Sequence, residues 1–325
     1  MPGTPFTPTS TAMMPTSTLT RCLAAAAVAV SLLAAPPVRA QRQQLPTGPA
    51  GDAIREGRRL VGQGKFDDAM AQYQKAVEAA PDLYEAHASM GVALDLMGKY
   101  AEARKHLAKA IDVASADQKG GALRNMAFSY AFERDAKGAI TYAKQVFDLE
   151  MAKPDYDAAA GVANELARLC LESGDIDNAF TWYTAGYQTA LKQAALSDTA
   201  KALWAFRWHH AQARISARRG KAKEALAHAA MAKAELDKGT NPDQASFLPY
   251  LNGYVAFYAG DMKTAIEELK KSSQDDPFVL SLTAQAYEKT GDNAAAMELW
   301  RKVMTFTMHN PTNAFARPEA RKRTG

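Results

Sequence analysis

Cysteine is nearly missing from this chain, since only Cys22 and Cys170 occur among its 325 residues. Long apolar runs are scarce as well, and the longest covers residues 22–35. A helix over that run rises about 21 Å, which is too short to cross a bilayer. The lack of cysteine excludes a disulfide-stapled fold and a zinc site built from thiolates, because both need several cysteines.

Proline is scarce outside the N-terminus, because eight of the 15 prolines lie in the first 50 residues. In this segment Arg21 precedes the apolar run, and small residues ending at Ala40 follow it. This order is typical of a secretory signal peptide. We therefore expect residues 1–40 to be a signal peptide and residues 41–50 to be a flexible linker, in a protein that is periplasmic or secreted. The alternative is a short membrane anchor that stays in place.

Neither sign of charge is in marked excess. The net charge is +4 for the whole chain and falls to +2 if Arg21 and Arg39 leave with the signal peptide. Most of the remaining excess lies in the last 14 residues, which carry a net +3. The body of the chain is therefore close to neutral, so we expect no nucleic-acid partner and no stable membrane insertion after signal cleavage.

Familiar catalytic and metal-binding motifs are also missing. The sequence has no G-x-S-x-G, no G-x-x-x-x-G-K and no H-E-x-x-H. His209 and His210 are adjacent, so on a helix they point about 100° apart, whereas a helical chelate needs a spacing of three or four. We expect no enzyme activity, no cofactor and no metal site, and we expect Cys170 to be a buried core thiol.

What the sequence does contain is a repeated turn. Gly64 begins GKFDDAMAQYQKAVEAAPD and Gly98 begins GKYAEARKHLAKAIDVASAD, at an offset of 34 residues. Each turn residue is followed five positions later by alanine and preceded seven positions earlier by glycine or alanine. Two antiparallel helices approach closely only where small side chains meet, and glycine supplies the left-handed end of the first helix. The pattern predicts helix–turn–helix units with turns at Gly64, Gly98, Arg134, Gly174, Gly220, Gly260 and Gly291.

The pattern resembles the tetratricopeptide repeat, which has small residues at its eighth and twentieth positions, glycine at the fifteenth and proline at the thirty-second. Pro81 and Pro277 match that last position. The resemblance covers residues 51–308 and implies an all-α, right-handed α-solenoid of about seven helix–turn–helix repeats. Residues 309–325 would form a C-terminal cap, in which Phe315 covers the last apolar face, followed by a basic, solvated tail.

One stretch, residues 202–220, combines aromatic residues with arginines. Trp204, Trp208, Ala211 and Ile215 recur at the spacing of one helical stripe, so we expect them in the core. The arginines fall at other positions of the repeat.

The resemblance assigns positions two, five, nine and thirteen of each repeat to the concave groove of tetratricopeptide arrays. In this chain those positions carry arginines opposite a stripe of tyrosines, which offers contacts to carboxylate or phosphate beside flat amphipathic surfaces. Other readings stay open: a solvated basic face, tyrosines that pack on the following helix, or a register slip of one residue. The candidate groove residues are Asn164, Arg168, Arg207, His210, Arg214, Arg218, Tyr250, Tyr254 and Tyr258.

These observations favour a non-enzymatic protein-binding scaffold of the bacterial cell envelope. Its groove is expected to hold an extended segment of a partner protein, either an acidic segment or a free C-terminus. A binding protein for an acidic small molecule or a glycan is the alternative, because walls of arginine and tyrosine suit those ligands too.

Overall fold

The computed structural model describes residues 45–153 and 155–325, so the expected signal peptide and residues 41–44 of the expected linker lie outside it. Helix α1 begins at Pro49, inside the segment expected to be linker. Within this described part no strand occurs, and no helix combines the length and the apolar character needed to span a membrane. The helices are α1 Pro49–Gly62, α2 Phe66–Ala79, α3 Tyr84–Met97, α4 Tyr100–Val113, α5 Ala116–Phe132, α6 Ala136–Met151, α7 Tyr156–Ser173, α8 Ile176–Ala190, α9 Asp198–Arg218, α10 Ala222–Asp237, a 3-10 turn Pro242–Ser246, α11 Phe247–Ala259, α12 Met262–Lys271, α13 Pro277–Thr290, α14 Asn293–Met304 and α15 Pro311–Thr324.

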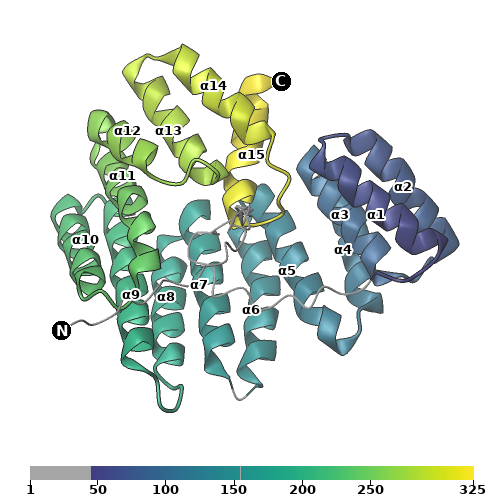
Figure 1. Cartoon of the computed structure of the whole chain (residues 1–325), viewed down its shortest axis with the longest axis horizontal. Coiled ribbons are helices and arrows are strands. Elements are labelled where there is room, and N and C mark those ends of the chain that lie inside the picture. Colours follow the sequence, from purple (N-terminus) through teal and green to yellow (C-terminus); the bar gives the residue numbers. More distant parts are fainter. Residues whose placement is uncertain (1–44, 154) are drawn as a thin grey trace, which may run out of the picture. The chain divides into compact units, whose positions relative to one another are not determined.

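Consecutive helices from α1 to α14 pack as seven pairs, each joined by a tight turn (Figure 1). The backbone at all seven predicted turn residues has a positive φ, from 59° at Arg134 to 95° at Gly174. Six of these seven residues are glycine, which adopts this conformation with little strain. The seventh, Arg134, adopts it with a side chain. The repeat pattern and the all-α solenoid predicted from it are confirmed.

Small side chains allow the two helices of each pair to approach. The seven alanines that follow the turns are all buried, with at most 2% of their surface exposed. At Gly91 an added Cβ would lie 2.6 Å from Leu107 Cδ2, and at Gly253 it would lie 2.6 Å from Leu269 Cγ. Both distances are far below van der Waals contact, so the neighbouring leucine would have to move to admit even a methyl group.

The middle repeats have longer helices, with 18 residues in α7 and 21 in α9, against 14 in each of α1 to α4. The expected stripe on α9 is buried at Trp204, Ala211 and Ile215. Trp208 is only partly buried and stacks on Tyr187 at a ring distance of 5.3 Å. Cys170 is fully buried, and burial raises the pKa of its thiol to about 12, so it stays protonated.

Overpacking of the helix contact tests the repeat register. Ala265 is buried in α12, and we expect Ala265→Leu to lower the free energy of unfolding by about 1–3 kcal/mol, because the longer side chain has no space between the helices. Ala71 is exposed on α2, so Ala71→Leu should change stability by less than about 0.5 kcal/mol. Urea denaturation measures both variants, and equal losses would contradict the register.

Candidate partner-binding site on the inner face

In several pairs the first helix also contacts the first helix of a neighbouring pair. Contacts of this kind join α1 with α3, α3 with α5, α9 with α11 and α11 with α13. We call the surface formed by positions two, five, nine and thirteen of these first helices the inner face. All nine candidate residues occupy positions two, five, nine or thirteen of α7, α9 and α11, so they belong to the inner face.

Arginine and tyrosine side chains do meet where α7, α9 and α11 come together. Arg218 Nη1 lies 3.1 Å from Glu172 Oε2, and the Tyr254 hydroxyl lies 3.3 Å from Glu172 Oε1. The Arg218 guanidinium also lies over the ring of Tyr258, 5.0 Å from its centre. Glu172 therefore supplies the negative charge of this cluster. Glu172 is not among the residues predicted from the sequence, although it precedes its turn glycine by two residues, as Arg218 precedes Gly220.

A second, buried group lies between α8, α9 and α11. His210 stacks on Tyr250 with ring centres 5.8 Å apart, and Arg214 Nη2 donates to the Tyr183 hydroxyl at 2.6 Å. Within the described residues, both ring nitrogens of His210, Nε and Nη1 of Arg214 and the Tyr250 hydroxyl have no hydrogen-bond partner. Because unpaired buried polar groups are unfavourable, this group lowers the stability of the fold unless something else pairs with it.

The remaining candidates lie around these two groups. The Arg168 guanidinium carbon lies 5.3 Å from the centre of the Phe278 ring, and that of Arg207 lies 4.7 Å from the centre of the Trp204 ring. Asn164 packs against α8 at a glycine, Gly186, where an added Cβ would lie only 2.6 Å from Asn164 Oδ1.

Burial controls protonation in the cluster. Burial, followed by the charges of Arg214 and Arg168, lowers the pKa of His210 well below its ordinary value, so the ring is neutral. Burial raises the pKa of Tyr258 to about 12, and burial together with the Glu172 carboxylate raises the pKa of Tyr254 well above its ordinary value. The tyrosines therefore stay protonated and can act as hydrogen-bond donors.

The nine candidate residues differ from expectation in their exposure. Arg218, whose side chain is 16% exposed, and Tyr258 are partly open, whereas the other seven are buried. The alternative of a solvated basic face is therefore wrong for Arg207 and Arg214. A segment lying on the surface would reach only the two partly open residues, and binding of a ligand by the set stays a prediction.

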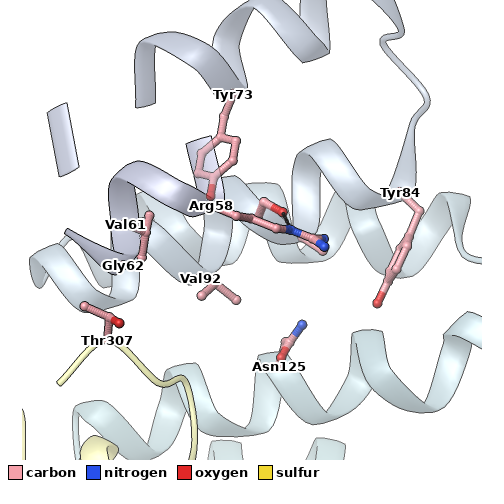
Figure 2. A pocket seen from close by; sticks show the side chains of 10 residues that line it. Arg58, Val61, Gly62, Tyr73, Tyr84, Val92, Asn125 and Thr307 are labelled. Carbon is pink, nitrogen blue, oxygen red and sulfur yellow. Dashed lines mark hydrogen bonds between the residues drawn. The ribbon is translucent and has the colours of Figure 1, made fainter. Parts of the chain in front are cut away.

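An open pocket lies at the other end of the inner face, between α1, α3 and α5 (Figure 2). Its volume is about 360 Å³, and the loop between α14 and α15 contributes Thr307 to its wall. We call it the N-terminal pocket, and none of its residues is among the groove residues predicted from the sequence. It is lined by Arg58, Val61, Gly62, Tyr73, Tyr84, Ala88, Ser89, Val92, Asn125 and Thr307.

The N-terminal pocket combines apolar walls with polar groups. Figure 2 shows the Arg58 side chain extending between Tyr73 and Tyr84. Arg58 is exposed and donates from Nε to Ser89 Oγ at 3.3 Å, and among the described residues no carboxylate forms an ion pair with it. Its positive charge is therefore available to an anionic group of a ligand.

The C-terminal segment, residues 305–325, lies between this pocket and the Arg218–Glu172 cluster. Helix α15 packs on α13 and α14, as a cap does, but it also contacts α5 and α7. In the loop before it, His309 Nε2 lies 2.9 Å from Asp95 Oδ2, and the His309 ring lies 5.4 Å from the ring of Phe132. Asp95 and Phe132 belong to the first helices of the second and third repeats, so the segment covers part of the inner face.

Arginines fasten α15 in this position. Arg317 is buried and donates to the carbonyl oxygens of Leu96 at 2.7 Å and of Met304 and Phe306 at 2.8 Å each. Burial, followed by the charge of Arg321, lowers the pKa of Arg317 to about 10. The expectation of a solvated basic tail is therefore wrong at Arg317, because backbone carbonyls replace water around its guanidinium.

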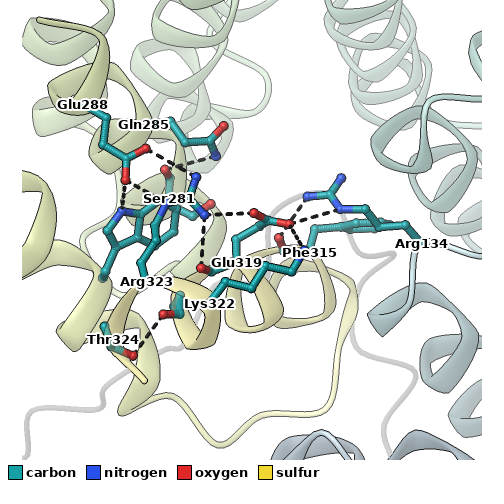
Figure 3. A network of polar contacts seen from close by, with 11 residues as sticks. Arg134, Ser281, Gln285, Glu288, Phe315, Glu319, Lys322, Arg323 and Thr324 are labelled. Atoms are coloured by element: carbon teal, nitrogen blue, oxygen red, sulfur yellow. Dashed lines mark hydrogen bonds and ion pairs between the residues drawn. The ribbon is translucent and has the colours of Figure 1, made fainter.

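Glu319, which is half-buried on α15, lies between two arginines (Figure 3). Arg323 Nη1 lies 2.9 Å from Glu319 Oε2, and Arg134 Nε lies 3.7 Å from Glu319 Oε1. Arg134 also donates to the backbone carbonyl of Glu172 at 2.9 Å. Arg134, the turn residue that is not glycine, thus joins α15 to the C-terminal end of α7, a contact that a glycine could not make.

Comparison with known proteins gives the same fold. A TPR repeat model matches residues 57–98, and a tetratricopeptide repeat model matches residues 84–117. No curated protein matches the chain. Among solved structures, a tetratricopeptide repeat protein from Parabacteroides merdae ATCC 43184 is 14% identical, with 85% of this chain and 98% of that chain covered and a TM-score of 0.50.

Aspartyl phosphate phosphatase F from Bacillus subtilis is also similar, at 11% identity, with 78% of this chain and 69% of that chain covered and a TM-score of 0.54. At such low identity the two structures show a common fold and nothing about ligands. The two models identify tetratricopeptide repeats within residues 57–117, and the seven helix pairs with their turns continue the same architecture through α14, in a fold shared with a solved tetratricopeptide repeat protein.

Proposed function

We propose that this chain is a non-enzymatic scaffold of the bacterial cell envelope, which holds an extended segment of a partner protein on its inner face. Tetratricopeptide repeat proteins are in general protein-interaction scaffolds. The assignment to the envelope depends on the signal peptide expected over residues 1–40.

The observation that carries this proposal is the position of the C-terminal segment. It places a polypeptide on the inner face of α3 and α5, held by Asp95 through a side chain and by the Leu96 carbonyl through Arg317. Free carbonyls at the end of a helix, a buried carboxylate and an aromatic wall are features that recognise a chain rather than a compact small molecule. Contacts of the same kind would bind a partner on the neighbouring, open part of the inner face.

The N-terminal pocket is the place where we propose that the partner docks. Val61 and Val92 offer apolar contacts to an extended chain, while Asn125 and the Tyr84 hydroxyl offer hydrogen bonds. Arg58 would pair with an acidic side chain or a C-terminal carboxylate, because it has no carboxylate partner among the described residues. This matches the acidic or C-terminal partner segment expected from the sequence.

A second candidate function is binding of an acidic small molecule, and one observation favours it. The unpaired donors of Arg214, His210 and Tyr250 lie close together and buried. A carboxylate ligand would pair with them and remove their unfavourable desolvation. Such a ligand would need the cluster to open, because His210 and Tyr250 have no exposed surface.

Photocrosslinking in host cells tests the docking site. With benzoyl-phenylalanine in place of Val92, we expect a covalent adduct to one polypeptide, identified by mass spectrometry. Arg58→Glu in the same chain should reduce the adduct several-fold, because it reverses the charge offered to an acidic segment. The matched control places the crosslinker at Lys75, which is exposed on α2. Equal adducts at both positions, or an adduct that Arg58→Glu leaves unchanged, would argue against the proposed site.

Two tyrosines on α11 separate a structural from a ligand-binding role of the buried cluster. Tyr250→Phe removes a buried hydroxyl without a partner among the described residues, so we expect the free energy of unfolding to rise by about 1 kcal/mol. Tyr254→Phe removes a bond to the Glu172 carboxylate and should lower it by about 1.5–3 kcal/mol.

Urea denaturation of protein purified without ligand measures both changes. Native mass spectrometry of the protein from its own host then reports any bound small molecule. If the cluster holds an acidic ligand, Tyr250→Phe should retain less of it than the unchanged chain. A destabilised Tyr250→Phe variant with no bound molecule would contradict both roles.

A further inference from the structure

Four of the six histidines form two pairs at equivalent places in the fold. His87 on α3 faces His106 on α4, and His209 on α9 faces His228 on α10. In each pair the first histidine precedes its turn glycine, Gly98 or Gly220, by 11 residues, and the second follows it by eight. Repeats two and five thus place histidines at the same two positions of the unit.

The two pairs have nearly the same geometry. The Nδ1 atoms lie 3.2 Å apart in the first pair and 3.3 Å apart in the second. The ring centres are 5.4 and 5.6 Å apart, and the ring planes are inclined by 26° and 29°. Two nitrogens bound to one tetrahedral zinc ion, each at about 2.0–2.1 Å, lie about 3.3 Å apart. The distance between the Nδ1 atoms of each pair therefore suits two nitrogens that bind one zinc ion.

The tautomer of His87 leaves a lone pair on Nδ1 that can bind a metal ion. His87 Nε2 lies 2.8 Å from the carbonyl oxygen of Pro81, so Nε2 must carry a proton to donate to it. In a neutral imidazole the other nitrogen, Nδ1, is then unprotonated and faces His106. Metal-bound histidines usually donate their second ring nitrogen to a carbonyl or carboxylate in this way, which fixes the ring and its tautomer.

Solvent and a carboxylate can complete the coordination. His106 and His228 are only half-buried, so an ion can reach the pairs. Glu102 precedes His106 by four residues, and Glu224 precedes His228 by four, which places each carboxylate on the same helix face as its histidine. Among the described residues no three such side chains are already grouped for an ion, so each pair offers two ligands, and water or a shifted glutamate supplies the others.

We propose that the His87–His106 pair chelates a divalent transition-metal ion of the zinc type, and that His209–His228 forms a second, equivalent site. Imidazole nitrogens suit zinc, nickel and copper, whereas calcium and magnesium prefer oxygen. On binding, the ion replaces the Nδ1 proton that His106 donates to His87, and His106 takes up a proton from solvent at Nε2, so that both ligands are neutral imidazoles and no net proton is released. With two protein nitrogens each, both sites bind more weakly than a closed four-ligand zinc site.

Calorimetric titration of the full chain with zinc chloride tests this proposal. We expect two zinc ions per chain, one in His106→Gln, one in His228→Gln and none in the double variant. Circular dichroism checks that the variants fold, which their half-exposed positions favour. The same number of ions in all four proteins would mean adventitious surface binding and would overturn the proposal, as would the absence of binding to the unchanged chain.

Cobalt(II) provides a readout that needs no variant. Bound to the unchanged chain through imidazole nitrogens, it should give visible absorption bands that added zinc removes. Calcium should leave the bands unaltered, because it does not compete for nitrogen ligands. If cobalt gives no bands, or if zinc does not displace them, the pairs are hydrogen-bonded histidines and nothing more.

Discussion

The buried guanidinium of Arg317 is the contact on which the arrangement of the inner face depends. It donates to carbonyl oxygens of α3, of the end of α14 and of the loop after it, and it thus joins segments 221 residues apart in sequence. The last carbonyls of a helix have no partner within the helix, so an arginine can bind them without breaking backbone bonds. In return, Arg317 gives up water without gaining a counter-charge, which is why its pKa falls.

This contact divides the inner face into parts with different uses. Near α7, α9 and α11, Glu172 neutralises Arg218 while tyrosines and His210 fill the remaining space. Over α3 and α5, the C-terminal segment covers Asp95 and Phe132. Between α1, α3 and α5, the polar and apolar side chains of the N-terminal pocket stay open. The proposed scaffold function therefore rests on the first repeats, away from the arginines that the sequence singled out.

The turns and the small-residue contacts were predictable from sequence because both are local. A left-handed turn at Gly174 and a buried alanine at Ala179 follow from spacing alone. The helical spacing also predicted the burial of Trp204 on α9. Trp208, predicted for the same stripe, is partly exposed. The structure brings His210 against Tyr250 and Arg218 against Tyr254 and Tyr258. The burial of the other candidate residues depends on how closely neighbouring helices approach, which no single repeat encodes.

Long-range partners could not be read from one sequence. Nothing local indicates that Arg317 meets Leu96, or that His309 meets Asp95, because both pairs depend on where the C-terminal segment returns. Glu172 could have been predicted from the sequence, because it occupies the same position of its repeat as Arg218. The two histidines of each pair lie 19 residues apart on two different helices. A spacing of three or four within one helix therefore does not indicate them.

Hydrogen exchange of the Arg317→Ala variant tests most directly that the C-terminal segment is held on the inner face by this guanidinium. We expect backbone amides of residues 305–325 to lose protection while those of α8 to α12 keep theirs, because the substitution weakens only the contacts that hold α15 on the inner face. Lys322→Ala, at an exposed side chain of the same helix, should leave the exchange unchanged. Unaltered protection of the segment in Arg317→Ala, or equal loss in both variants, would show that the Arg317 guanidinium does not hold the segment.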